Sequence, residues 1–209
     1  MDRVLTFGSS GRPGVLFSAN GFHPNAYSLL LSELGEDWQF KAPLMRPYWR
    51  PNLDAHCSTW MLFYDDFRSL VESIDTPVFA MGHSIGATLL LKFALEYPDK
   101  FSHIVLFDPA LFPKHFNYLY RVLKIFGLTR KLHPMIPKTM KRKDSFASTD
   151  QMFERMREKA FLSYISDEQL RLIIDSSLEH RDDGYYHLSC SKNWEAEIYH
   201  SCCSLDLEI

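Results

Sequence analysis

The chain is 209 residues long, with 46% apolar and 23% charged side chains, which suffices for one substantial hydrophobic core. Its 23 basic and 26 acidic residues give a formal charge of −3. Because so slight a charge creates no long-range field that would gather nucleic acid or an anionic membrane, small apolar or ester molecules are the expected partners.

The four cysteines show no paired spacing typical of metal ligands, so neither a disulfide framework nor a zinc site is expected. The first residues lack the basic start and apolar core of a secretory signal, and no apolar run approaches the roughly 18 residues of a membrane span. These features favour a cytoplasmic protein without a membrane span. We interpret the cysteines as reduced packing residues: Cys57, Cys190, Cys202 and Cys203.

Short apolar runs in the first half of the chain alternate with helical patterns. Strands are expected at residues 6–8, 15–19, 39–44, 78–82 and 104–108. Helices are expected at residues 27–34, 60–74 and 85–97. Ser58 or Thr59 is placed to cap the second helix. This alternation predicts an α/β fold with a mainly parallel sheet covered on both faces.

The character of the sequence changes after Pro109. Residues 112–180 show no convincing strand pattern, but they contain an aromatic-rich helix candidate at 116–127 and a basic stretch at 130–143. We interpret this part as a helical lid inserted into the α/β core. The expected division is a core at 1–111, a lid at 112–190 and the start of a return to the core at 191–209.

A G-x-S-x-G sequence, Gly82-His83-Ser84-Ile85-Gly86, lies between a predicted strand and a predicted helix, as a nucleophile elbow requires. A serine on such a turn adopts a strained backbone conformation, and the glycines let the strand and helix pack closely. The helix N-terminus supplies free N–H groups for a developing oxyanion. Ser84 is therefore the predicted catalytic nucleophile. The alternative is a chance match in an ordinary strand-to-helix loop.

A second signal, Asn20-Gly21-Phe22, follows the predicted strand at 15–19. In folds with a nucleophile elbow, one oxyanion donor is the backbone N–H after the serine, here that of Ile85, and the other comes from this loop. The N–H of Phe22 is the candidate second donor. The alternative is that Asn-Gly is simply a frequent turn dipeptide.

Several segments together resemble the α/β-hydrolase superfamily. They are residues 17–22, Arg46-Pro47-Tyr48-Trp49, Ser58-Thr59-Trp60, the elbow and residues 106–110. The likeness is greatest to the single-domain, lid-bearing "hydrolase 6" branch, which includes esterases and carbon–carbon bond hydrolases. Residues 142–146 and 193–199 resemble lid and post-lid segments of that branch. The resemblance spans nearly the whole chain and implies a serine hydrolase with no metal or organic cofactor.

In this superfamily the acid and the histidine of the catalytic triad follow the serine, beyond the lid. The resemblance places the end of the lid near Tyr199, and residues 200–209 are too few for the strands that carry these groups. We therefore expect a truncated chain that lacks its C-terminal strands and the usual triad partners. Asp108 stands where a few relatives place their acid, but it is more simply a turn residue before Pro109.

Other histidines are candidates for a replacement base, although each is more simply a surface or packing residue. His83 adjoins the serine and is interpreted as a packing or gating residue. His23 lies on the predicted oxyanion loop. The others lie at the far end of a strand or in or just after the lid: His103, His133, His180, His187 and His200.

Two features of the lid have alternative interpretations. An aromatic stripe is most simply the face that packs on the core, and secondarily a hydrophobic wall for a substrate. The basic stretch at 130–143 is most simply a solvated face, with an anionic-ligand or phospholipid surface as the alternative. The stripe comprises Phe116, Leu119, Tyr120, Leu123 and Phe126.

The expected function is hydrolysis of an ester or related acyl bond. Ser84 attacks the carbonyl, and the N–H groups of Phe22 and Ile85 stabilise the oxyanion. The alternative is a catalytically inactive fragment or domain that binds a small apolar ligand. Incomplete cover of the sheet also predicts an exposed apolar patch and self-association.

Overall fold

The computed structural model describes residues 3–49 and 55–202, so Cys203 and the rest of the expected return segment after it lie outside the described residues. Five strands form one sheet in the order β1-β3-β2-β4-β5. They are β1 (Val4–Phe7), β2 (Arg12–Phe17), β3 (Trp38–Pro43), β4 (Val78–His83) and β5 (Phe101–Phe107). Only the edge strand β1 runs antiparallel to its neighbour. The expected mainly parallel α/β sheet is confirmed.

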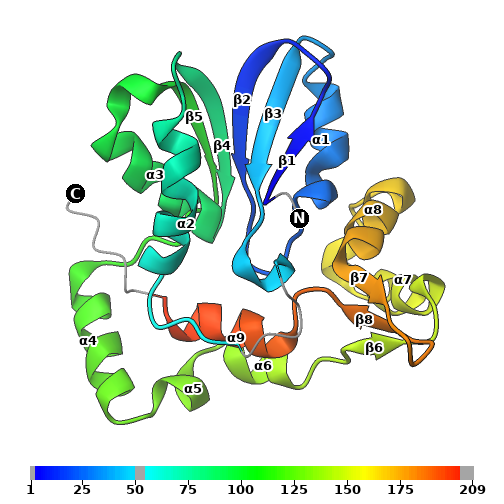
Figure 1. The fold of residues 1–209 in the computed structure, drawn as a ribbon. Helices are drawn as coiled ribbons and strands as arrows, with labels where there is room; N and C mark the ends of the chain where they lie inside the picture. Colours follow the sequence, from blue (N-terminus) through cyan, green and yellow to red (C-terminus); the bar gives the residue numbers. More distant parts are fainter. Residues whose placement is uncertain (1–2, 50–54, 203–209) are drawn as a thin grey trace.

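Helices cover both faces of this sheet (Figure 1). On one face lies α1 (Ser28–Glu33), which follows the 3-10 turn η1 (Pro24–Tyr27). On the other lie α2 (Met61–Glu72) and α3 (Ile85–Glu96). The N-cap of α2 is Trp60, without a side-chain cap bond, so neither Ser58 nor Thr59 occupies the cap position; the Thr59 hydroxyl accepts from the N–H of Met61 at 3.2 Å just before it. Two further 3-10 turns are η2 (Arg46–Tyr48) and η3 (Pro98–Lys100).

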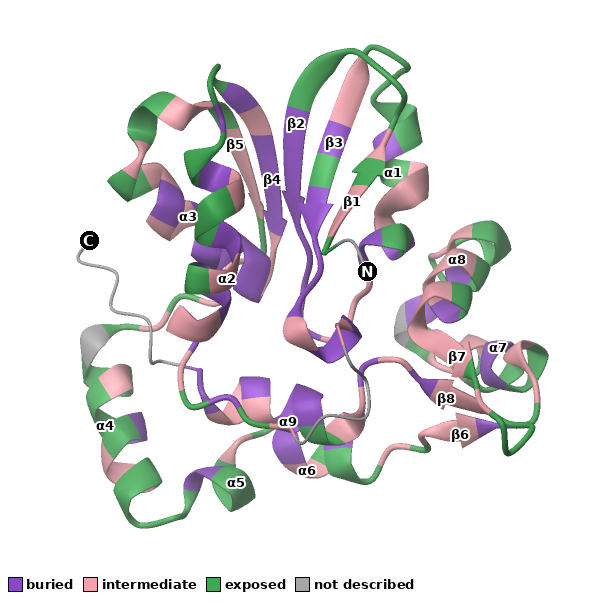
Figure 2. Ribbon diagram, in the orientation of Figure 1, coloured by how far each residue is buried: buried purple, intermediate pink, exposed green. Residues whose placement is uncertain are grey.

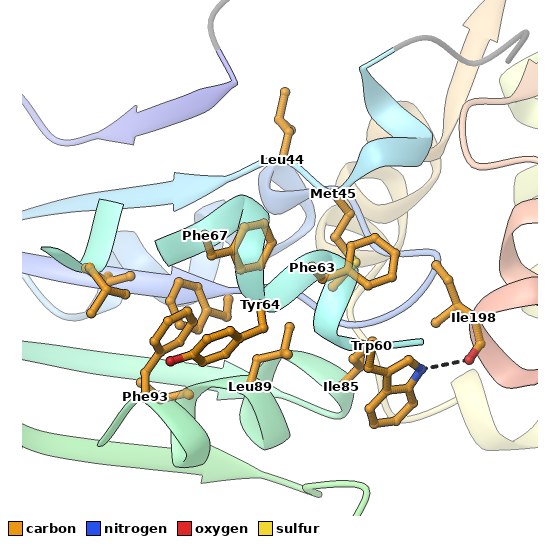
Figure 3. Packing of buried hydrophobic residues seen from close by; sticks show 14 of the residues in the cluster. Leu44, Met45, Trp60, Phe63, Tyr64, Phe67, Ile85, Leu89, Phe93 and Ile198 are labelled. Carbon is orange, nitrogen blue, oxygen red and sulfur yellow. Dashed lines mark hydrogen bonds between the residues drawn. The ribbon is translucent and has the colours of Figure 1, made fainter. Parts of the chain in front are cut away.

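The larger hydrophobic core lies between the sheet and the pair α2 and α3, where Figure 2 shows mostly buried residues. Aromatic rings fill it: Phe17 stacks on Phe67 with centroids 5.2 Å apart, and Tyr64 stacks on Phe93 at 4.1 Å (Figure 3). Offset ring pairs of this kind stabilise a core beyond the area they bury. The packing holds β2, β4 and α3 in a fixed relation, and these are the elements that carry the serine elbow and the loop beside it.

The rest of the chain lies beyond the carboxyl ends of β2 and β4 (Figure 1). Its first helices are α4 (Lys114–Ile125), α5 (Thr129–Leu132) and α6 (Ile136–Met140). Then come β6 (Ser145–Phe146), α7 (Thr149–Arg157), η4 (Ala160–Leu162), α8 (Asp167–Ser177), β7 (Leu178–His180) and β8 (Tyr186–Leu188). The last element is α9 (Lys192–His200). The middle of this part has its own small core, centred on Leu170 and Ile174.

The expectation that residues 112–180 hold no strand is wrong. β6 and β7 lie in that range and pair antiparallel with β8 in a three-stranded sheet of order β6-β8-β7. Strands of two and three residues are shorter than the roughly four to eight residues over which alternation becomes a recognisable signal, so periodicity does not reveal them. β6 pairs with β8 across about forty residues, for example Phe146 with Tyr186, whereas β7 and β8 form a local hairpin.

The expectation that the aromatic stripe of α4 packs on the core is also wrong for most of its members. Tyr120 is buried, and its hydroxyl donates to the carbonyl of Tyr199 at 3.2 Å. Phe116 is 40% exposed, Leu119 52% and Phe126 71%. The helix therefore meets the rest of the molecule along a narrow line through Tyr120, and a wide apolar surface stays open to solvent.

Cys57, Cys190 and Cys202 are buried, as expected for packing residues. In the part of the chain that the structure describes, no helix is long and apolar enough to cross a membrane.

Candidate active site

Ser84 forms the turn between β4 and α3 and has φ 53° and ψ −121°. Among the described residues other than glycine, only Ser84 and Asp108 have a positive φ. Such a conformation costs about 1–3 kcal/mol and persists only where the surroundings enforce it. Here the Ser84 N–H donates to the carbonyl of Phe107 at 2.9 Å, and the Ser84 carbonyl accepts from the N–H of Thr88 at 3.1 Å. Both sides of the turn are thus anchored.

The glycines of the G-x-S-x-G sequence are required by close backbone approach. A β-carbon added to Gly86 would lie 2.2 Å from the carbonyl oxygen of Phe17, and one added to Gly82 would lie 2.6 Å from the α-carbon of Ala87. Neither neighbour is a flexible side chain that can move aside. The spacing seen in the sequence therefore reflects how closely α3 packs on β4 and β2.

The serine borders an apolar cavity of about 240 Å³. Its walls come from the start of α2 (Trp60), the start of α3 (Ile85), the segment 133–135 and the last turns of α9. Ile85 is the first residue of α3, and an N–H at that position has no partner within its own helix. The cavity therefore combines a serine, a backbone donor and apolar walls.

The wall formed by α9 was not predicted from the sequence. The indole Nε1 of Trp60 donates to the carbonyl of Ile198 at 2.8 Å (Figure 3). This bond joins residues 138 positions apart in the chain. It brings Ile198 and Tyr199 to the cavity, and no local pattern in the sequence reports a contact over that distance.

The predicted oxyanion loop lies beside the elbow, with the Phe22 and His83 rings 5.8 Å apart. However, the N–H of Phe22 donates to the carbonyl of Ala19 at 3.1 Å and closes a turn. This N–H has to leave or share that bond before it can reach an oxyanion. Ile85 and Phe22 are therefore not equivalent donors in this structure.

Glu195 of α9 also holds the same loop in place. The Asn20 side chain donates through Nδ2 to the Glu195 carbonyl at 3.1 Å. The Glu195 side chain is buried and forms an ion pair with Arg142. It also accepts from the hydroxyl of Thr139, a residue of α6, at 3.2 Å. The loop is thus joined to α9 through the backbone of Glu195, and the carboxylate of the same residue joins α9 to α6.

A second anchor joins the loop to the residue before the serine. The hydroxyl of Tyr27 accepts from the N–H of Ala19 at 3.1 Å and is hydrogen-bonded to Nδ1 of His83 at 2.8 Å. Burial lowers the pKa of His83, and the nearby Asp108 carboxylate opposes that shift only in part. His83 is absent from the cavity wall, in keeping with a packing residue.

Asp108 also has a positive φ, of 45°, and is exposed at the end of β5. It does not line the cavity beside Ser84. Its backbone geometry is that of a turn residue that closes the strand, as the simpler sequence interpretation holds.

No histidine in the described part of the chain is hydrogen-bonded to Ser84. Within residues 3–49 and 55–202, no side chain forms a hydrogen bond with the Ser84 hydroxyl. His133 does line the cavity, but its Nδ1 accepts from the N–H of Met135 at 3.1 Å, and its Nε2 lies 3.9 Å from the Cys202 sulfur. Both of its ring nitrogens therefore face other groups.

Most of the other histidine candidates have structural partners of their own. His23 caps η1 by accepting from the N–H of Asn25 at 3.2 Å. His200 lies 3.0 Å from the Thr129 hydroxyl. His187 lies 2.8 Å from Asp183, His180 packs on Tyr186, and His103 is exposed on β5.

Comparison with known proteins places this geometry in a family. A family model described as "Serine aminopeptidase, S33" matches residues 50–166, more than half of the chain. The chain belongs to this family of α/β-hydrolases. The superfamily expected from the sequence is confirmed, and the matched model names the serine aminopeptidase family within it. No curated protein matches the sequence.

Solved structures support the same fold for this α/β-hydrolase. A thioesterase domain from the curacin biosynthetic pathway superposes with a TM-score of 0.64 at 17% identity, over 92% of this chain and 69% of that domain. E-2-(acetamidomethylene)succinate hydrolase gives 0.64 at 16% identity, over 95% of this chain and 68% of the other. A peroxisomal α/β-hydrolase from Saccharomyces cerevisiae gives 0.62 at 16%, over 94% and 57%. This chain thus spans about two thirds of their length or less.

Proposed function

We propose that this protein is a serine hydrolase that cleaves an ester or related acyl bond, with Ser84 as its nucleophile. The observation that carries the proposal is the strained Ser84 backbone, at φ 53°, held at the mouth of an apolar cavity. Strain at a polar residue that borders a cavity is typical of a site where a side chain must be aimed at a ligand. Membership of a hydrolase family supports the same conclusion.

In the proposed reaction, the Ser84 oxygen adds to the substrate carbonyl carbon and its proton passes to the departing alcohol. Water then cleaves the acyl-enzyme to release the acid and restore the serine. The Ile85 N–H stabilises the oxyanion in both steps, and Phe22 joins it once its bond to Ala19 opens. The cavity of about 240 Å³ has mainly apolar walls, so we propose a small apolar acyl group for it. We also propose the division into a core at 1–111, a lid at 112–190 and the start of a return to the core at 191–209.

A second candidate is a domain that binds a small apolar ligand without turnover. It is favoured by one observation: in the described ranges, no base forms a hydrogen bond with the Ser84 hydroxyl. A serine without a base is a poor nucleophile at neutral pH.

The test is covalent labelling with an alkyl fluorophosphonate, with the modified residue located by peptide mass spectrometry. Modification at Ser84 and its loss in Ser84→Ala are expected. Ser163→Ala is the matched control, because Ser163 is exposed and distant in the sequence from the elbow. Equal labelling of several serines, or none at Ser84, would leave the ligand-binding alternative.

A further inference from the structure

Charge is distributed very unevenly along this chain. Residues 109–143 contain nine lysines and arginines and no aspartate or glutamate. Since the whole chain carries 23 basic and 26 acidic residues, the remaining 174 residues hold 14 basic against 26 acidic ones. The overall charge of −3 is therefore the sum of a strongly basic segment and an acidic remainder. Near this segment the electrostatic field is positive, although the small net charge predicts no long-range field.

The same segment carries most of the exposed apolar surface. Among the described residues, ten of the sixteen large apolar side chains that are well exposed lie between positions 111 and 140. Ile125 is 81% exposed, and its neighbour Phe126 71%. Such a concentration exceeds the scattered apolar residues of an ordinary surface and marks an interaction site.

The two properties are combined on one side of the molecule. The helices α4, α5 and α6 lie at the end away from the sheet (Figure 1), and Figure 2 shows α4 largely exposed, whereas α6 is partly buried. One arc of α4 carries Tyr118, Val122 and Ile125, which follow the i, i+4 and i+7 spacing. Arg121 lies at the edge of that arc. Lys131 and Lys138 are exposed on the two helices that follow.

We propose that the surface formed by α4, α5 and α6 binds an anionic phospholipid bilayer. Exposed apolar side chains flanked by lysine and arginine are the combination that lets helices lie in a membrane interface, where apolar groups enter the acyl boundary and basic groups meet lipid phosphates. A second copy of this chain would bring the same basic segment against itself, and that repulsion disfavours self-association through this face. An anionic surface supplies the complementary charge.

The surface adjoins the proposed active site. Met135 is 40% exposed and also lines the cavity beside Ser84, together with His133 and Pro134. A bilayer on this face would therefore lie next to an entrance of the cavity. Apolar substrates dissolved in the lipid would then reach Ser84 without crossing water. Bilayer binding itself does not depend on Ser84, so the two proposals fail separately.

The test is flotation of the full chain with vesicles of phosphatidylcholine alone or with about 30% phosphatidylserine, at about 0.1 M and about 0.5 M salt. Binding to the anionic vesicles should be stronger by about tenfold or more, and it should weaken in high salt. Lys131→Glu with Lys138→Glu should reduce it by about tenfold or more. Lys41→Glu with Arg155→Glu changes the net charge equally at exposed positions elsewhere and should leave binding within about twofold.

The apolar part is tested by Ile125→Ser with Phe126→Ser, against Leu95→Ser with Tyr164→Ser as a control at other exposed apolar positions. Only the first pair should lose binding, and Ser84→Ala should bind like the unchanged protein. Circular dichroism checks that each variant is folded. The proposal is overturned by equal binding to neutral vesicles or by no binding. It is equally overturned if sedimentation shows a dimer that only the Ile125 and Phe126 changes dissociate, since a second copy would then cover the face.

Discussion

The side-chain amide of Asn20 donates to the backbone carbonyl of Glu195 at 3.1 Å, although the two residues are 175 positions apart. Asn20 belongs to the loop beside the serine elbow, and Glu195 belongs to the last helix. The Glu195 carboxylate in turn holds Arg142 and Thr139. The loop that is expected to supply an oxyanion donor is therefore positioned by residues from the opposite end of the chain.

Replacing Glu195 by alanine should lower the free energy of unfolding by about 2–3 kcal/mol. The change removes a buried carboxylate that accepts from both Arg142 and Thr139, and it leaves the half-buried Arg142 guanidinium without its ion-pair partner. Urea unfolding measures the effect. Glu154→Ala is the control, because Glu154 is exposed on α7 and a surface change of this kind stays within about 0.5 kcal/mol. Equal effects in the two variants would contradict a stabilising role for the Glu195 carboxylate.

Replacing Gly86 by alanine should cost at least about 3 kcal/mol or prevent folding, because the new methyl group meets the Phe17 carbonyl at 2.2 Å. Gly127→Ala is the matched control. Gly127 has φ +67° and no atom within 4 Å of the added carbon, so only the backbone strain of about 1–2 kcal/mol applies. Thermal unfolding followed by circular dichroism distinguishes the two. A Gly86→Ala protein as stable as Gly127→Ala would show that the elbow is looser than the structure has it.

Stability should fall as the pH is lowered from about 6.5 towards 5. Burial lowers the pKa of His23 and of His83 below the ordinary value of 6.5. The unfolded chain therefore takes up protons in this range before the folded chain does, and the free energy of unfolding decreases as the pH falls through the folded pKa values. Urea unfolding at several pH values measures the slope. His83→Gln should flatten it, whereas the exposed His103→Gln should not; identical slopes for both variants would refute the assignment.

The α/β part of the molecule was predictable from sequence because its signals are local. β4 is a central strand covered on both faces, so it appears as an unbroken apolar run between Pro77 and Gly82. The elbow was predictable for a related reason, since Gly82 and Gly86 are each required by a backbone atom nearby. Helix α2 was found because Phe63, Phe67 and other buried residues recur at helical spacing.

The features that were missed depend on contacts between distant parts of the chain. The cavity wall formed by Ile198 rests on its bond to Trp60, and the exposure of the α4 stripe depends on how little of that helix meets the core. The hydrogen bond from the Phe22 N–H to the Ala19 carbonyl is local in the sequence, yet it was also missed. The Asn-Gly dipeptide is compatible both with this closed turn and with a loop in which the N–H is free to bind an oxyanion. Sequence alone does not separate those two conformations.

Turnover of short p-nitrophenyl esters by this chain should be very slow, even though Ser84 is labelled by a fluorophosphonate. In the described residues, the Ser84 hydroxyl has no hydrogen-bonded base, and the one histidine on the cavity wall, His133, turns its Nδ1 to the N–H of Met135. Loss of the histidine from a serine triad costs on the order of 10⁶-fold in turnover, and the oxyanion hole and binding leave roughly 10³–10⁴-fold over water.

His133→Ala should therefore not change the residual rate, whereas Ser84→Ala should abolish labelling. The measurements are steady-state ester hydrolysis and fluorophosphonate labelling of the three proteins at equal concentration. Rapid turnover that disappears in both variants would identify His133 as the base and would show that the ring reorients when substrate binds.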